Sequence, residues 1–103
     1  MAIIVEWSEQ AASSLEEIFG YHKKVAGVRI ARKIATKITQ RTQILSDNPL
    51  AGQREELLQD LSVEFRYLVE GNYKILYYIL PEKVIVSFVF DCRQNPEKMQ
   101  NIK

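Results

Sequence analysis

The stretch FRYLVEGNYKILYYILPEKVIVSFVFDCRQNP, residues 65–96, decides the fold that we expect for this chain. It contains two apolar runs separated by Glu70-Gly71-Asn72, and a third run that follows Pro81-Glu82-Lys83. Apolar and β-branched residues bounded by Gly, Asn and Pro are typical of strands joined by short turns. The stretch therefore predicts a three-strand antiparallel meander. The predicted strands are residues 63–69, 73–80 and 84–90.

The part of the chain before the meander predicts one strand and two helices. Residues 2–6 are suited to a short first strand, and Ser8 is a good N-cap for a helix that ends near Gly27. A second helix is expected from about residue 28 to residue 46, because the proline of Asp47-Asn48-Pro49 disfavours helical geometry in the residue before it. The short connection predicts an antiparallel αα-hairpin. The expected element order is β-α-α-β-β-β, which belongs to the α+β class.

The register of the first hairpin in the meander is predicted from which faces of its strands are more apolar. A three-residue loop pairs Val69 with Tyr73 and gathers the apolar side chains on one face. The face that we expect the helices to cover holds Phe65, Tyr67, Ile75 and Tyr77. The same register places Arg66 and Lys74 together on the opposite face, with Tyr78 nearby. A two-residue Gly-Asn turn would mix polar and apolar side chains, so we predict against it.

The composition is that of a single soluble, globular domain, residues 1–103. The chain is 47% apolar and 26% charged. Its single cysteine, Cys92, excludes an internal disulfide and fits a reducing compartment. No stretch approaches the ~20 apolar residues of a membrane span, and the first ten residues lack the basic region of a signal peptide. We therefore expect a cytoplasmic protein that does not contact a membrane.

Charge is unevenly distributed along the chain, although the net charge is only +1. No acidic residue lies between Ile18 and Ser46. The cations of the second predicted helix include Arg29, Arg32, Lys33 and Lys37. Their spacing of three or four residues aligns part of this charge in a stripe. Because no aromatic residue is interleaved, the stripe favours a solvated face or a landing site for an acidic partner segment over a nucleic-acid interface.

The candidate catalytic residues are cations and a tyrosine in or just after the meander. They are Arg66, Lys74, Tyr78 and Arg93. Such groups on one face of a sheet can hold a phosphate backbone and stabilise charge on a scissile phosphate without a metal. In the alternative interpretation, Arg66 and Lys74 are ordinary strand residues paired with neighbouring glutamates. Spacing alone favours this alternative, because surface cations are common on strands.

Metal and cofactor chemistry has no signature in the sequence. His22, the only histidine, lies beside the apolar stripe of the first helix, and a lone histidine cannot make a metal site. We expect a structural role for His22 and a buried or half-buried position for Cys92. No glycine-rich phosphate loop is present, so we expect neither a metal nor another cofactor.

The order and spacing of several motifs resemble the RelE/ParE superfamily of bacterial toxins, from about Val5 to Pro96. The motifs are Trp7-Ser8 followed by Ala11 and Leu15, the connector Asn48-Pro49-x-x-Gly52, the sequence Arg66 … Gly71-x-Tyr73-Lys74-Ile75-x-Tyr77, and the ending Phe90-Asp91-x-Arg93. The resemblance implies an αα-hairpin packed on a mainly antiparallel sheet. It also implies a type II toxin–antitoxin system in a bacterial cytoplasm, with an antitoxin that wraps the toxin in a hetero-oligomer.

The resemblance leaves two activities open. RelE-like members are mRNA interferases, metal-independent endoribonucleases that cut messenger RNA on the ribosome, and Arg66, Lys74 and Arg93 stand at comparable places. This sequence departs from that pattern in two ways: the second predicted strand carries one cation, and the tail after Arg93 has no Tyr or His. Without such a residue, no evident side chain can donate the proton that the leaving group needs.

The longer helical hairpin and the ending FDCRQNPEKM resemble the ParE branch instead. Members of this branch are plasmid-stabilisation toxins that poison DNA gyrase by binding it. We therefore expect a ParE-like toxin that binds its target. The RelE-like ribonuclease and a relative without toxicity are the alternatives.

Overall fold

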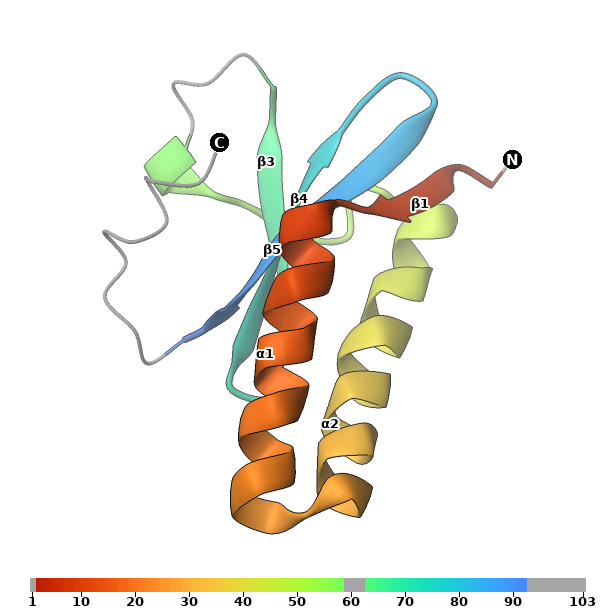
Figure 1. Ribbon diagram of the computed structural model, residues 1–103. Coiled ribbons are helices and arrows are strands. Elements are labelled where there is room, and N and C mark those ends of the chain that lie inside the picture. Colours follow the sequence, from red (N-terminus) through yellow and green to blue (C-terminus); the bar gives the residue numbers. More distant parts are fainter. Residues whose placement is uncertain (1, 59–62, 93–103) are drawn as a thin grey trace.

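The computed structural model describes residues 2–58 and 63–92, and its elements follow the predicted order. Two helices, α1 (Glu9–Ala26) and α2 (Val28–Arg41), form an antiparallel hairpin that covers one face of a sheet of five described strands (Figure 1). The strands are β1 (Ile4–Trp7), β2 (Gln53–Arg54), β3 (Phe65–Glu70), β4 (Tyr73–Ile79) and β5 (Lys83–Asp91). Two short 3-10 helices are η1 (Thr42–Ser46) and η2 (Glu56–Leu58). The fold is α+β, as predicted.

The strands are arranged in the order β1-β5-β4-β3-β2. The three strands of the predicted meander are adjacent and antiparallel, while β1 pairs in parallel with β5 at one edge. Strand β2 was not predicted. It belongs to the connector (residues 47–58) and pairs with β3 at the other edge. The connector therefore forms part of the sheet as well as linking the hairpin to it.

Local signals predicted both ends of α1 and the start of α2. The Ser8 hydroxyl accepts a hydrogen bond from the backbone N–H of Ala11 (3.0 Å), which caps α1. Gly27 separates the helices with a φ of 96°, a conformation that glycine adopts without steric cost. Helix α2 is shorter than predicted, because the regular helix ends at Arg41 and a 3-10 helix continues to Ser46. None of the described helices is both long and apolar enough to cross a bilayer.

The predicted register of the β3–β4 hairpin is wrong by one residue. Glu70, not Val69, pairs with Tyr73, so the turn has two residues, Gly71 and Asn72. Gly71 has a φ of 59°. Positive φ at the first turn position suits the short hairpin turns that match the twist of a sheet.

The shift of one residue exchanges the two faces of β3. Leu68 lies opposite Ile75 and is buried beneath the helices together with Tyr77. Phe65 and Tyr67, predicted for this face, lie on the far side of the sheet. The predicted helix-covered face is therefore correct for β4 and wrong for β3.

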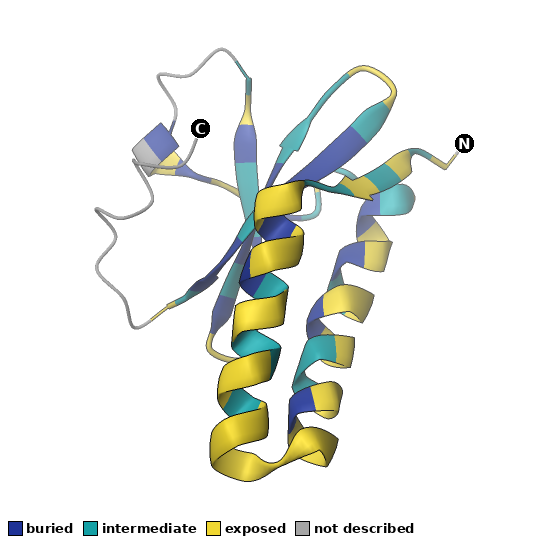
Figure 2. Cartoon of the chain, viewed as in Figure 1, coloured by how far each residue is buried: buried dark blue, intermediate teal, exposed yellow. Residues whose placement is uncertain are grey.

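Both faces of the sheet are packed, which explains the wrong register. The main core lies between the helices and the sheet, and the helices are buried only on the side that faces it (Figure 2). A second, smaller core on the far face joins Leu58 of η2 to Phe65, Leu76 and Phe90. Because β3 buries apolar residues on both faces, matching its more apolar face to that of β4 does not identify the side that the helices cover.

Candidate functional site

Arg66 connects the sheet to the connector. Its guanidinium donates a hydrogen bond from Nη1 to the carbonyl oxygen of Gly52 (2.7 Å) and forms an ion pair with Glu64. Its side chain is only 17% exposed. The structure thus gives Arg66 the neighbouring-glutamate partner of the alternative interpretation, and a backbone partner in addition.

Lys74 makes a comparable contact from the other side of the sheet. Its Nζ donates to Oε2 of Glu55 (2.8 Å) and lies 4.2 Å from the centroid of the Tyr67 ring. The Glu55 side chain is only 5% exposed, and a carboxylate buried to this degree is costly unless a cation or hydrogen-bond donors compensate it. Tyr78 packs its ring against Phe65 with centroids 5.3 Å apart. Lys74 therefore compensates a nearly buried charge of the connector.

The prediction that Arg66, Lys74 and Tyr78 share one face is wrong. Arg66 lies opposite Tyr77 on the helix-covered side of the sheet, whereas Lys74 and Tyr78 lie on the far side. The physical reason is the two-residue turn, which moves every side chain of β3 to the other face relative to β4. Arg93 falls outside the described residues. The catalytic roles of all four residues remain predictions.

A buried tyrosine that sequence reasoning did not select fixes the connector to the sheet. The Tyr77 hydroxyl donates to the carbonyl oxygen of Pro49 (2.7 Å) and accepts from the N–H of Gly52 (2.9 Å). Burial raises the pKa of Tyr77, although the Gly52 hydrogen bond and the charge of Arg66 act in the opposite direction. A Cβ at residue 52 would lie 2.5 Å from the Tyr67 carbonyl oxygen and 2.7 Å from the Tyr77 hydroxyl. The Asn-Pro-x-x-Gly motif was the signal for this contact.

The four predicted binding cations of α2 are all exposed, and we call them the cationic stripe. The cationic stripe consists of Arg29, Arg32, Lys33 and Lys37. With Thr36 and Gln40, these residues line a shallow depression of about 460 Å³. Within residues 2–58 and 63–92, no acidic side chain forms an ion pair with any of them. The cationic stripe is therefore a solvent-facing row of positive charge on α2.

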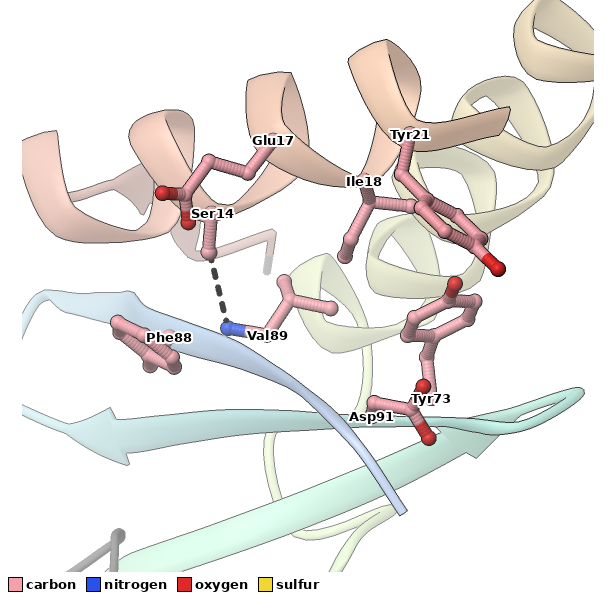
Figure 3. Close-up of a pocket in the computed structure, with 8 residues that line it drawn as sticks. All are labelled: Ser14, Glu17, Ile18, Tyr21, Tyr73, Phe88, Val89 and Asp91. Carbon is pink, nitrogen blue, oxygen red and sulfur yellow. Dashed lines mark hydrogen bonds between the residues drawn. The ribbon is translucent and has the colours of Figure 1, made fainter. Parts of the chain in front are cut away.

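A pocket of about 470 Å³ lies between α1 and β5 (Figure 3). On one wall, the buried Ser14 hydroxyl donates to the carbonyl oxygen of Ala11 (2.8 Å) and accepts from the N–H of Val89 (3.1 Å). On another, the side chains of Tyr21 and Tyr73 approach each other from the helix and the sheet. Ser14 therefore ties α1 to the middle of the sheet beside this pocket.

A second pocket, which we call the turn pocket, adjoins the first and shares Tyr21 and Tyr73 with it. It has a volume of about 380 Å³ and lies between the helix hairpin and the β3–β4 turn. Its apolar lining residues are Tyr21, Val25, Ile34, Ile38 and Tyr73. Lys37 and Glu70 also line it, and Lys37 belongs to the cationic stripe as well. The turn pocket and the depression along the stripe therefore share one residue, Lys37.

His22 joins α1 to the sheet at the edge of the turn pocket. Its Nε2 lies 2.8 Å from the hydroxyl oxygen of Tyr73, in keeping with the structural role expected for it. Cys92, expected to be buried or half-buried, is exposed, so that prediction is wrong. In the described part of the chain, no group of three or more His, Cys, Asp or Glu side chains could hold a metal ion.

The family model described as the ParE toxin of type II toxin–antitoxin system, parDE, matches residues 5–96. A solved structure titled "Chromosomal ParDE TA system from P. aeruginosa" matches with a TM-score of 0.72 and 17% sequence identity, over 87% of this chain and 96% of that chain. At this identity the structural match shows a shared fold. No curated protein sequence matches the chain.

Proposed function

Because the chain belongs to the ParE toxin family of type II toxin–antitoxin systems, we propose that it inhibits growth by binding DNA gyrase in the bacterial cytoplasm. We further propose that a cognate antitoxin neutralises it by forming a hetero-oligomer. The observation that carries binding rather than RNA cleavage is the separation of Arg66 and Lys74 on the two faces of the sheet.

Cleavage of RNA without a metal needs several cationic and acid–base groups that converge on one phosphate. Arg66 and Lys74 would have to supply this charge, yet they belong to opposite faces. Each is also engaged in the structure, Arg66 with Gly52 and Glu64, and Lys74 with Glu55. Moving Lys74 to a substrate would withdraw a cation from a nearly buried carboxylate, which is costly. These contacts suit a structural role for both cations, and so support a toxin that acts by binding.

The test compares the two activities with one preparation of purified protein. In the first reaction, purified gyrase and supercoiled plasmid are incubated with the protein, and linear DNA is measured after denaturation of the enzyme. In the second, the protein is added to a translating extract and messenger RNA ends are mapped by primer extension. We expect gyrase-dependent linear DNA and an intact message.

New cuts at codons in the ribosomal A site would contradict gyrase binding as the activity. If Arg66→Ala and Arg93→Ala abolish these cuts, the protein is a RelE-like ribonuclease instead. Because Arg66 also contacts Gly52, a thermal melt must show that Arg66→Ala remains folded. Tyr78→Phe is the matched test of the tyrosine, since it keeps the ring that packs on Phe65. Intact DNA together with intact message would identify a family member without toxicity.

A further inference from the structure

The pocket between α1 and β5 has the size and the lining of a site for a small molecule. Its volume of about 470 Å³ lies within the range of ligand pockets, roughly 300–1,000 Å³. Its apolar and aromatic lining residues are Ile18, Tyr21, Tyr73, Phe88 and Val89. A mostly apolar wall with a few polar groups is the usual arrangement by which a pocket binds and orients a small ligand.

The polar groups of this pocket select the charge of the ligand. Glu17 lines it from the helix and Asp91 from the strand (Figure 3). Among the described residues, no Lys, Arg or His lines the pocket. Glu17 also takes part in none of the ion pairs found within residues 2–58 and 63–92. The pocket therefore attracts a cation and repels a ligand that carries a carboxylate or a phosphate.

The two tyrosine rings of the pocket are held in place by His22. The His22 ring packs edge-on against Tyr21, with centroids 5.1 Å apart, and its Nε2 lies 2.8 Å from the Tyr73 hydroxyl oxygen. Tyr73 is only 8% exposed, so its ring has little freedom to move. Aromatic rings attract ammonium groups that come within about 6 Å of the ring centre. The rings therefore favour the same charge of ligand as the carboxylates do.

We propose that this pocket binds a small aliphatic diamine or polyamine. One ammonium group pairs with Glu17 and another with Asp91, while the methylene chain lies on the apolar lining and the tyrosine rings. Two carboxylates attract two positive charges more strongly than one, and burial of the chain adds apolar contact. Such a ligand is independent of the proposed function, since neither gyrase nor an antitoxin takes part in its binding.

A metal ion fits this pocket less well than an organic cation. The described residues hold no group of three or more His, Cys, Asp or Glu side chains that could bind a metal, here or elsewhere. A hard divalent ion such as Mg²⁺ keeps several of its waters and has no apolar part to contact Ile18 and Val89. Mg²⁺ therefore serves as the probe for positive charge without a carbon chain.

The first test compares the diamine cadaverine with lysine, which has the same carbon chain and the same two amines but adds a carboxylate. The other probes are n-pentylamine, which has one amine, and Mg²⁺. Binding is measured by titration calorimetry at an ionic strength of about 0.15 M, which screens long-range attraction between exposed charges. We expect cadaverine to bind at least about tenfold more tightly than lysine, and severalfold more tightly than n-pentylamine.

Amide shifts in nuclear magnetic resonance locate the bound ligand. Cadaverine should shift amides of α1 around Glu17 and amides at the end of β5. Equal binding of cadaverine and lysine would overturn the proposal, as would equally tight binding of Mg²⁺. Shifts confined to the acidic connector would show attraction to surface charge alone and would also overturn it. Absence of binding at about 1 mM cadaverine would have the same consequence.

A pair of adjacent glutamates on α1 supplies a matched control. Glu16 is exposed like Glu17 but does not line the pocket. Glu17→Gln should weaken cadaverine roughly two- to fivefold, which corresponds to the loss of one exposed ion pair, and Glu16→Gln should leave binding unchanged. Glu17→Gln should also reduce the advantage of cadaverine over n-pentylamine. Equal effects of the two substitutions would contradict the proposed site.

Thermal melting gives a readout that does not depend on locating the ligand. A ligand that binds only the folded chain raises the melting temperature as its concentration rises. Cadaverine should therefore stabilise the wild-type protein and the Glu16→Gln variant more than it stabilises the Glu17→Gln variant. Lysine should have little effect on any of the three. The same rise in all three proteins with cadaverine would overturn the assignment to this pocket.

Discussion

Removing one oxygen atom from the buried Tyr77 should release the connector from the sheet. In Tyr77→Phe, the carbonyl oxygen of Pro49 loses a donor at 2.7 Å and the N–H of Gly52 loses an acceptor at 2.9 Å. The ring is completely buried and keeps its packing. The substitution therefore tests the two hydrogen bonds with little change in apolar contact.

The expected loss of stability follows from these two contacts. A hydrogen bond within a protein contributes roughly 0.5–1.5 kcal/mol net, and a buried donor left without a partner costs about 1–3 kcal/mol. The Gly52 N–H is such a donor, because its hydrogen bond to Tyr77 is buried. We therefore expect the free energy of unfolding to fall by about 2 kcal/mol. For a domain of this size, the melting temperature should fall by roughly 8–16 °C.

Urea denaturation followed by circular dichroism measures the change, with thermal melting as a second readout. Tyr67→Phe is the matched control, since its hydroxyl donates to Oε1 of Gln53 in an exposed position (3.0 Å). It should cost less than about 0.5 kcal/mol. If Tyr77→Phe and Tyr67→Phe were equally mild, the connector would not depend on the buried hydroxyl, and the reasoning would be refuted.

Three further predictions concern the close contacts of the connector and the buried hydrogen bond between α1 and β5. Gly52→Ala should destabilise the fold by about 1–3 kcal/mol in urea, because its Cβ would meet the Tyr67 carbonyl oxygen and the Tyr77 hydroxyl; a neutral result would contradict the close approach. Because burial raises the Tyr77 pKa, stability should be retained up to the unfolded pKa of about 10 and then lost as pH rises through the higher native value. A Tyr77→Phe variant that shows the same alkaline loss would refute this assignment. Ser14→Ala should cost about 1–2 kcal/mol and speed hydrogen exchange at the Val89 amide, which loses its acceptor; unchanged exchange there would argue against the bridge.

The elements with local signals could be predicted from the sequence. A helix end depends on its nearest residues, so the Ser8 cap and the break at Gly27 were identified without tertiary information. The β3–β4 register could not be identified in the same way, because it depends on what covers each face of the sheet. Leu58 of η2 packs against the far face of the sheet, and no residue pattern within β3 indicates this contact.

In the candidate site too, some features follow from local spacing and others depend on tertiary contacts. The residue types of the cationic stripe and their exposure followed from spacing on a helix. The Gly52 partner of Arg66 and the Glu55 partner of Lys74 belong to the connector, whose two-residue strand β2 is too short to give a periodic pattern. The connector motif with Pro49 and Gly52 was visible in the sequence. Its structural role could not be predicted, because it depends on Tyr77, which lies 25 positions after Gly52.

The pairing of β1 with β5 sets a time order for folding during synthesis. The hydroxyl of Ser8, at the end of β1, donates to the carbonyl oxygen of Ser87, 79 positions later. At a synthesis rate of ~5–20 residues per second, about 4–16 s separate these residues. The α1–α2 hairpin has only local contacts to make and can form within this interval. Its sheet-facing side can meet β3 and β4 first, but it completes its packing only when β5 is made. The described sheet is therefore complete only after β5 has been synthesised, and a chain that stops before β5 leaves β1 without the strand it pairs with.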